Sequence, residues 1–502
     1  MPRLGQKLPF IKWFGVLVLL IILALWLERF FLRMQLEGYK EHLTAQGELL
    51  DLSILHPPLI DDSSNGFSVV IDVVRMLPLL PDRETGIPAV PSMARVSPGV
   101  ARVTWKEKTL RTYAYTRGNV ISNLWAELPA YIEPNRDLII RLQEGCAMSE
   151  FQFSRKVTED GPALMEKAGT IKCVPRWLQS VATYEMRQGD LESAAKCQLN
   201  LIRFLHKQAA APDTISQLVR RSTMNPIFSA QWELLQYHQW PEATLKEWQD
   251  EWSRLAFCEH LPVELRWERA WNTDLLTRAR TDVSAHADLI GVPTGTPWDL
   301  INNDPRAALT LAGHQLVWPA WVSYADERRL LEMAQSALDL TKRLIATQSF
   351  IAVQTELNGM TNASDLLPVL FVASRQTWSP YLHFMIRHAC NDDNRVSLAV
   401  SAIALERWHK RHGDYPESLN QLVPEFLHSI PLDHIDGKPI RYRRTESYFI
   451  LWSIGLNGID EGGDDTPINS KSYFRRKDFV WPRPASPSEV AAYVAGAAWN
   501  TP

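Results

Sequence analysis

Glycine is scarce in this chain, which has 23 glycines among 502 residues. Folds built mainly from β-strands need many tight turns, and glycine is a frequent residue in those turns. The low glycine content therefore argues against a mainly β fold, and the 19 tryptophans suit large cores between packed helices. A chain of this length is also too long for one hydrophobic core, so we expect two or more domains.

An excess of positive charge is also lacking. The chain has 53 Lys and Arg residues against 57 Asp and Glu residues, which gives a net charge of -4 and a pI near 6.4. Binding to a nucleic-acid backbone requires clustered Lys and Arg side chains. We therefore expect no nucleic-acid partner.

Paired cysteines are missing as well. The odd number of cysteines excludes a complete disulfide framework, and no C-x-x-C pair or metal-ligand spacing to a histidine occurs. Buried thiols are the simplest interpretation, while a single bridge in an oxidising compartment stays open. The five cysteines are Cys146, Cys173, Cys197, Cys258 and Cys390.

The common catalytic signatures do not occur in the sequence. There is no nucleotide-binding G-x-x-x-x-G-K-[ST] or G-x-G-x-x-G, no nucleophile elbow G-x-S-x-G and no zinc-binding H-E-x-x-H. We therefore assign no catalytic residue. The sequence favours a protein without enzymatic activity but leaves an enzyme open.

Two groups of polar residues invite a functional interpretation. In the first, His383 and His388 are five residues apart, which separates them by about 140° around a helix, so they do not face one metal ion. A metal site is therefore the less favoured interpretation of this group, which also contains Cys390, Asp392 and Asp393. The second group predicts a salt-bridged surface or a buried network rather than an acid/base pair; it consists of Glu264, Arg266, Glu268 and Arg269.

The chain has one long apolar run, WFGVLVLLIILALWL, at residues 13–27. As a helix, residues 10–27 span roughly 27 Å, close to the hydrocarbon thickness of a bilayer. A cleavable signal peptide is the alternative, but charged and bulky residues follow the run where small ones are needed. We therefore predict a basic cytoplasmic tail (1–12) and an uncleaved transmembrane signal anchor (13–32). The protein would then be a single-pass protein of a bacterial inner membrane, with its N-terminus in the cytoplasm and its bulk in the periplasm.

A helical period dominates the next part of the chain, which we predict to be a stalk and an α-helical extracytoplasmic body (33–390). Its clearest unit lies at 177–207, where Gly189 and Asp190 separate two amphipathic helices, so we expect an αα-hairpin. We also predict a short helix within 66–81 and a Pro-punctuated loop at 81–99. Further predicted helices lie at 119–132, 133–145, 213–224, 243–257, 262–280 and 326–350.

The pattern changes near residue 395. Residues 395–413 predict a helix that ends at Gly413, and the segments 431–444, 447–455 and 477–484 are typical of β-strands separated by turns. We therefore expect a small C-terminal α+β module (395–484), with one helix on an antiparallel sheet, followed by a tail (485–502). The predicted fold class of the whole chain is mainly α.

The sequence of this module resembles the globular domain of type II secretion major pseudopilins. The resemblance rests on ALERWHKRHGDYPESLNQLV, PLDHIDGKPIRY, LWSIGLNGIDEGGDD and DFVW. In that family an acidic loop holds Ca²⁺, so the resemblance implies calcium as a cofactor. Its implied ligands are Asn457, Asp460, Asp464, Asp465 and Asp478.

The chain departs from the pseudopilin pattern because about 360 residues separate the apolar run from the module. The whole layout resembles uncharacterised membrane-anchored proteins of planctomycete and verrucomicrobial bacteria, which brings no activity with it. The function that we expect is binding or scaffolding in the cell envelope, with an envelope protein as partner. A periplasmic hydrolase with a cleft in the helical body and a component of a type II secretion-like apparatus are the alternatives.

Overall fold

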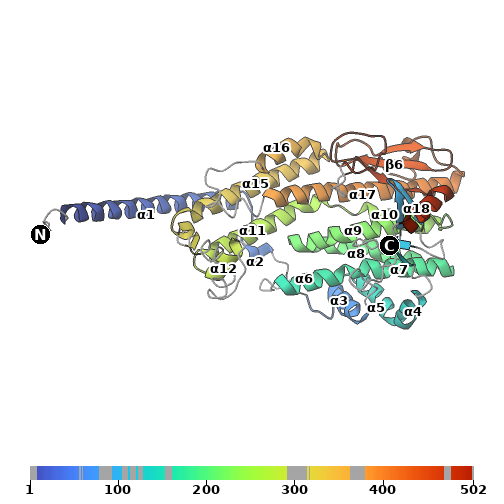
Figure 1. Ribbon diagram of the computed structural model, residues 1–502, viewed down its shortest axis with the longest axis horizontal. Coiled ribbons are helices and arrows are strands. Elements are labelled where there is room, and N and C mark those ends of the chain that lie inside the picture. The colour runs from blue at the N-terminus through green and yellow to red at the C-terminus, as the bar shows by residue number, and fades with distance from the viewer. Residues whose placement is uncertain are drawn as a thin grey trace. The chain divides into compact units, whose positions relative to one another are not determined.

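The computed structural model confirms the mainly helical class, with 69% helix and a small C-terminal antiparallel sheet (Figure 1). It describes residues 8–55, 58, 60–78, 93–103, 111–113, 120–122, 128–152, 161–290, 312, 314–315, 317–361, 379–468 and 476–499. These residues form two compact units. Unit 1 comprises Met1–Pro57, Pro262–Lys342 and Gln354–Met385, and unit 2 comprises Pro58–Leu261, Arg343–Val353 and Ile386–Pro502.

Unit 1 consists of helices packed around leucine and tryptophan side chains. Leu36 and Leu43 of the first helix pack against Leu331, and Leu52 packs against Trp267. The elements that lie wholly or mainly in this unit are α1 (Leu8–Ala45), α2 (Leu52–Leu55), α11 (Leu261–Ala279), α12 (Val283–Leu289), the π-helix η7 (Trp318–Val322), α15 (Ser323–Thr347) and α16 (Ile351–Thr361). The end of α15 from Arg343 onward and the start of α16 up to Val353 belong to unit 2.

The segment that we predicted as the transmembrane anchor (13–32) lies within α1. Residues 1–7 of the predicted cytoplasmic tail lie outside the described residues. Within the described residues, none of the helices combines the length and the apolar character that a membrane crossing requires. Every described side chain from Trp13 to Glu28 is exposed, and α1 is buried only beyond that point.

The N-terminal part of unit 2 is a layer of helices. The predicted αα-hairpin at 177–207 is confirmed: Gly189 ends its first helix with a φ of 89°, and Asp190 caps the second by accepting a hydrogen bond from the Ser193 N–H at 3.0 Å. The helices are α3 (Gly66–Met76), α4 (Leu128–Ile132), α5 (Arg136–Ala147), α6 (Gly161–Ile171), α7 (Cys173–Gln188), α8 (Leu191–Lys207), α9 (Thr214–Leu235) and α10 (Glu242–Ser253). Short 3₁₀ helices η4 (Glu133–Asn135), η5 (Gln208–Ala210) and η6 (Cys258–His260) join them.

The C-terminal part of unit 2 begins with the long helix α17 (Ser379–His412), which ends at Gly413 as predicted. The predicted sheet is confirmed as β5 (Arg441–Arg444), β6 (Phe449–Ile454) and β7 (Asp478–Trp481), with β6 in the centre and both pairings antiparallel. The 3₁₀ helix η9 (Leu419–Leu422) precedes this sheet, and α18 (Pro487–Trp499) lies in the predicted tail.

Two sequence predictions were wrong in the N-terminal part of unit 2. Residues 93–97, which we expected in a loop, form β1 (Met93–Ser97), and β1 pairs with β2 (Val100–Val103). Residues 120–122, which we expected in a helix, form β4 (Val120–Ser122), paired with β3 (Arg111–Tyr113). The β-branched Val120 and Ile121 favour an extended backbone, so strand pairing prevails over the helical period.

The C-terminal module packs into the same unit as the helices α3–α10. Strand β8 (Arg483–Pro484) pairs in parallel with β2, and Trp232 of α9 donates its indole N–H to the Pro482 carbonyl. The Trp481 ring packs against Phe228 with ring centroids 5.0 Å apart. The module that we predicted at 395–484 therefore belongs to unit 2, together with the helices α3–α10.

Candidate metal centre

Unit 2 contains a cavity of about 250 Å³. Its lining comes from the segment after α10, from the C-terminal end of α15, from the middle of α17 and from the loop before β5. The polar groups on this lining include Arg254, Cys258, Glu259, Asp393, Ser397 and His434. The cavity therefore brings together a thiol, two carboxylates and an imidazole.

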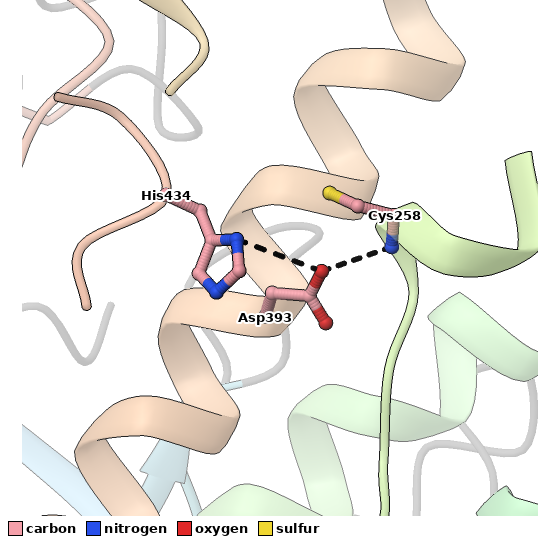
Figure 2. A group of neighbouring side chains, drawn as sticks. All are labelled: Cys258, Asp393 and His434. Atoms are coloured by element: carbon pink, nitrogen blue, oxygen red, sulfur yellow. Dashed lines mark hydrogen bonds and ion pairs between the residues drawn. The ribbon is translucent and has the colours of Figure 1, made fainter. Parts of the chain in front are cut away.

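Three of these side chains converge. One ligand atom from each of Cys258, Asp393 and His434 lies within 4.8 Å of the other two. Figure 2 shows that Nδ1 of the His434 ring points toward the Asp393 carboxylate, while the other ring nitrogen points away. Cys258 begins η6, Asp393 lies on α17 and His434 lies in the loop before β5.

Backbone hydrogen bonds hold Asp393 and Cys258 side by side. The two oxygens of Asp393 accept the N–H groups of Phe257 at 2.7 Å and Cys258 at 2.9 Å. Both donors lie at the start of η6, where helix N–H groups have no partner within the helix. Asp393 thus caps η6 from another helix and places its carboxylate beside the Cys258 side chain.

The backbone around His434 is tied to the same helix. The His434 N–H donates to Asn394 Oδ1 at 2.6 Å, and Asn394 follows Asp393 on α17. The carbonyl of His434 accepts the Phe350 N–H at 2.9 Å. The distance of 3.9 Å from His434 Nδ1 to Asp393 Oδ2 is too long for a hydrogen bond, so the ring and the carboxylate face one another without one.

The Cys258 thiol is not activated as a nucleophile. Its Sγ donates to Cys390 Sγ at 3.7 Å, and this hydrogen bond together with burial raises the pKa of Cys258 well above its ordinary value. A catalytic cysteine requires a lowered pKa, because the thiolate is the reactive form. The raised pKa of Cys258 therefore argues against a cysteine nucleophile.

Burial also shifts the pKa values of three ionisable groups of unit 2 that lie near this cluster in the sequence. Burial, with the nearby Arg220, lowers the pKa of His260 to about 4, and burial lowers the pKa of His388 to about 4. Burial raises the pKa of Asp392 to about 6. These shifts reflect removal from water, which disfavours the charged form of each group.

The search for metal-ligand spacings in the sequence did not find this group of three residues. Of the residues in the 383–394 segment, Asp393 alone belongs to the cluster, and its partners Cys258 and His434 come from distant parts of the chain. No helix-face pattern links the three, because they lie on three different elements. The recognisable signal was the concentration of polar residues in CNDDN at 390–394, in the buried middle of a helix.

Four of the predicted calcium ligands lie in the loop between β6 and β7 and Asp478 begins β7, and each of the five makes hydrogen bonds or ion pairs within the protein. The buried Asp465 pairs with Arg95 at 2.7 Å and with Arg476, and it accepts the Gly99 N–H at 3.0 Å. Asp464 pairs with Lys477 at 2.7 Å, and this hydrogen bond lowers the pKa of Asp464. These two aspartates bind cationic side chains.

The remaining three predicted ligands shape the loop. Asp478 accepts the N–H groups of Gly463 at 2.8 Å and Asp464 at 3.1 Å, and its burial raises its pKa to about 6. Asp460 accepts the Trp452 indole N–H at 2.9 Å, and Asn457 donates to Glu461 at 2.7 Å. Calcium binding at this loop stays a prediction.

The charged group of the predicted helix at 262–280 forms a buried network in unit 1. The fully buried Arg269 donates to Glu48 Oε2 at 2.8 Å, and Arg266 lies 3.4 Å from the same oxygen. Glu268 accepts from Asn272 at 3.3 Å.

Comparisons of the chain with protein-family models, with curated proteins and with solved structures find no match.

Proposed function

We propose that this protein is anchored in a cell-envelope membrane by α1 and serves there as a binding or scaffolding protein. The observation that carries the proposal is the exposure of apolar side chains along the first half of α1. Trp13 is 75% exposed, Leu17 54% and Leu19 66%. A soluble monomer rarely leaves such a continuous apolar surface in water, so this half of the helix needs an apolar environment.

The position of the exposed half also supports an anchor. The second half of α1 contacts the rest of unit 1: Glu28 accepts the Trp321 indole N–H at 3.0 Å, and Arg29 lies over the Tyr324 ring. Residues 10–27 are long enough, at roughly 27 Å, to cross the hydrocarbon core of a bilayer. The basic residues before the run favour a cytoplasmic N-terminus and a periplasmic body.

Removal of residues 1–27 is expected to release the protein from membranes. The full chain should stay in the membrane pellet through washes with high salt and alkaline carbonate, since neither extracts a transmembrane helix. The truncated chain should be recovered in the soluble fraction with the same thermal unfolding midpoint, because the side chains that the structure describes between Trp13 and Leu27 are exposed. Recovery of the intact full chain in the soluble fraction would contradict the anchor.

The C-terminal module is the proposed surface for an envelope partner. Ile459 is 58% exposed in the loop between β6 and β7, beside the acidic residues of that loop. The resemblance to pseudopilins supports a secretion-like apparatus as the alternative setting, and it carries the calcium proposal with it.

Calcium should raise the thermal unfolding midpoint of the purified protein if the acidic loop binds it. A ligand at 100 times its Kd stabilises the native state by about 2.7 kcal/mol. The double variant Asp460→Asn, Asp464→Asn should lose this shift, whereas Asp274→Asn, in an exposed ion pair of unit 1, should keep it. Absence of a shift, or an equal shift in both variants, would remove the calcium proposal.

A hydrolase with its active site in the helical body is the second candidate function. The cavity of about 250 Å³ with Cys258, Asp393, His434 and Glu259 on its lining favours it. Such a mixture of carboxylate, imidazole and thiol in a concave site is typical of active sites. The raised pKa of Cys258 argues against a cysteine nucleophile, so hydrolysis here would depend on an ion held by these residues.

A further inference from the structure

We propose that Cys258, Asp393 and His434 bind one divalent transition-metal ion of the zinc class. This inference goes beyond the membrane-anchored role, and neither proposal depends on the other. Its basis is the convergence of a sulfur, a carboxylate oxygen and an imidazole nitrogen within 4.8 Å of one another at the wall of a cavity (Figure 2).

The separations are close to those of a tetrahedral site. Zinc binds sulfur at about 2.3 Å, nitrogen at about 2.0 Å and oxygen at about 2.1 Å, which places neighbouring ligand atoms about 3.3–3.7 Å apart. His434 Nδ1 and Asp393 Oδ2 are 3.9 Å apart. These two atoms are therefore slightly farther apart than two ligands of one zinc ion, and the ligand atoms of all three residues lie within 4.8 Å of one another.

The chemistry of the three ligands selects the ion. Thiolate and imidazole groups favour zinc and similar transition metals, whereas calcium and magnesium require sets of oxygen ligands. Cys258, Asp393 and His434 offer one sulfur, one nitrogen and one oxygen. The class of ion proposed here thus differs from the calcium proposed for the loop between β6 and β7.

The surrounding hydrogen bonds orient the Asp393 carboxylate and fix the backbone of His434 in advance. Each oxygen of Asp393 accepts one backbone N–H, and a carboxylate oxygen has a second lone pair that stays available for an ion. Asn394 Oδ1 accepts the His434 N–H, while its amide donates to the Ser453 hydroxyl at 2.7 Å. Such outer contacts fix the directions of metal ligands and contribute to affinity.

The cavity leaves room for a fourth ligand and a path for the ion. A volume of about 250 Å³ holds several water molecules, and the His434 side chain is 16% exposed. Three protein ligands and one water are the composition of zinc sites that keep an open position. The ion would therefore remain accessible to small molecules that enter the cavity.

Cobalt is the probe that tests the site, because a cobalt–thiolate bond has its own charge-transfer absorption. The purified full chain, kept reduced and stripped of metal with a chelator, should bind one equivalent of Co²⁺ with this absorption. Zn²⁺ should displace the cobalt, since zinc binds such sites more tightly. Cys258→Ser and His434→Gln should each weaken Co²⁺ binding at least about 100-fold.

Cys173→Ser is the matched control, because Cys173 is a partly exposed thiol outside the cluster. This variant should keep the absorption and the affinity. The proposal is overturned if the native chain gives no thiolate absorption, or if Cys258→Ser retains it. His434→Gln keeps the backbone bonds of its loop, so it provides a folded variant if Cys258→Ser unfolds.

The thiol pair provides an independent check. Cys258 Sγ and Cys390 Sγ are 3.7 Å apart. A small disulfide reagent could oxidise the two thiols to a Cys258–Cys390 bond, and the reagent would take up their two electrons and two protons as it is reduced to two thiols. The oxidised pair would offer no thiolate to an ion. Rapid alkylation of the chain as isolated, followed by mass spectrometry of its peptides, should find Cys258 unlinked. A Cys258–Cys390 disulfide in the isolated protein would overturn the metal proposal.

Discussion

Replacement of Asp433 by alanine should lower the free energy of unfolding of unit 2 by about 3–5 kcal/mol. The side chain of Asp433 is fully buried and accepts the N–H groups of Ile435 at 2.9 Å and Ile454 at 2.8 Å. It also accepts the Ser453 hydroxyl at 2.9 Å and pairs with Arg441. Alanine would leave the buried N–H groups of Ile435 and Ile454 without this acceptor and would remove one partner of Arg441. Urea unfolding followed by circular dichroism would measure the loss.

Asp433→Asn is the matched control, because the amide keeps one oxygen acceptor and the shape of the side chain. Burial raises the pKa of Asp433, so the native state binds its proton more tightly than the unfolded chain does. The native chain should therefore lose stability as the pH rises from the ordinary aspartate pKa to the raised one. Asp433→Asn should lack this pH dependence. A loss below about 1 kcal/mol in Asp433→Ala would contradict the role assigned to Asp433.

Asp433 also positions the candidate metal centre, since it directly precedes His434 in the chain. Its bonds to Ser453 and Ile454 connect the turn before β5 to the end of β6. The strands themselves were predictable, because aromatic and β-branched residues alternate between clear turn signals. The hydrogen bonds from Ile454 and Ser453 to Asp433 could not be predicted, since a strand pattern does not reveal which buried carboxylate accepts from which backbone N–H.

The helical hairpin at 177–207 shows what local sequence can predict. Gly189 adopts a positive φ and Asp190 caps the next helix, and both roles depend on neighbouring residues only. Strand β1 shows the limit of the same reasoning. Residues 93–97 become a strand because β2 pairs with them and β8 extends that sheet, and β8 lies almost 400 residues away in the sequence.

The candidate metal centre depends on long-range contacts in the same way. Asp393 meets the Cys258 N–H across 135 residues of sequence, and the donor is a backbone group that any residue type would supply. The identity of the residues around Asp393 therefore contains no sign of its partner. The acidic loop, by contrast, was recognisable from its own composition, but the pairing of Asp465 with Arg95 across 370 residues was not.

Replacement of Gly455 by alanine should be among the most destabilising single changes in the C-terminal module. A Cβ atom at Gly455 would lie 1.7 Å from the Lys477 carbonyl oxygen and 2.6 Å from the Arg476 carbonyl oxygen. Both contacts are with backbone atoms, so relief requires β6 and β7 to separate at this end, and we expect a loss of about 4 kcal/mol or more.

Gly462→Ala separates this clash from the cost of a strained backbone. Gly462 has a φ of 73°, and no atom lies within 4 Å of the position that a Cβ would take there, so its replacement should cost only about 1–2 kcal/mol. Urea unfolding of both variants, with limited proteolysis of the loop between β6 and β7, gives the comparison. Because Gly455 directly follows β6, its variant should also expose this loop to protease, whereas Gly462→Ala should not. Equal losses in the two variants would show that β6 and β7 do not approach as closely as the structure requires.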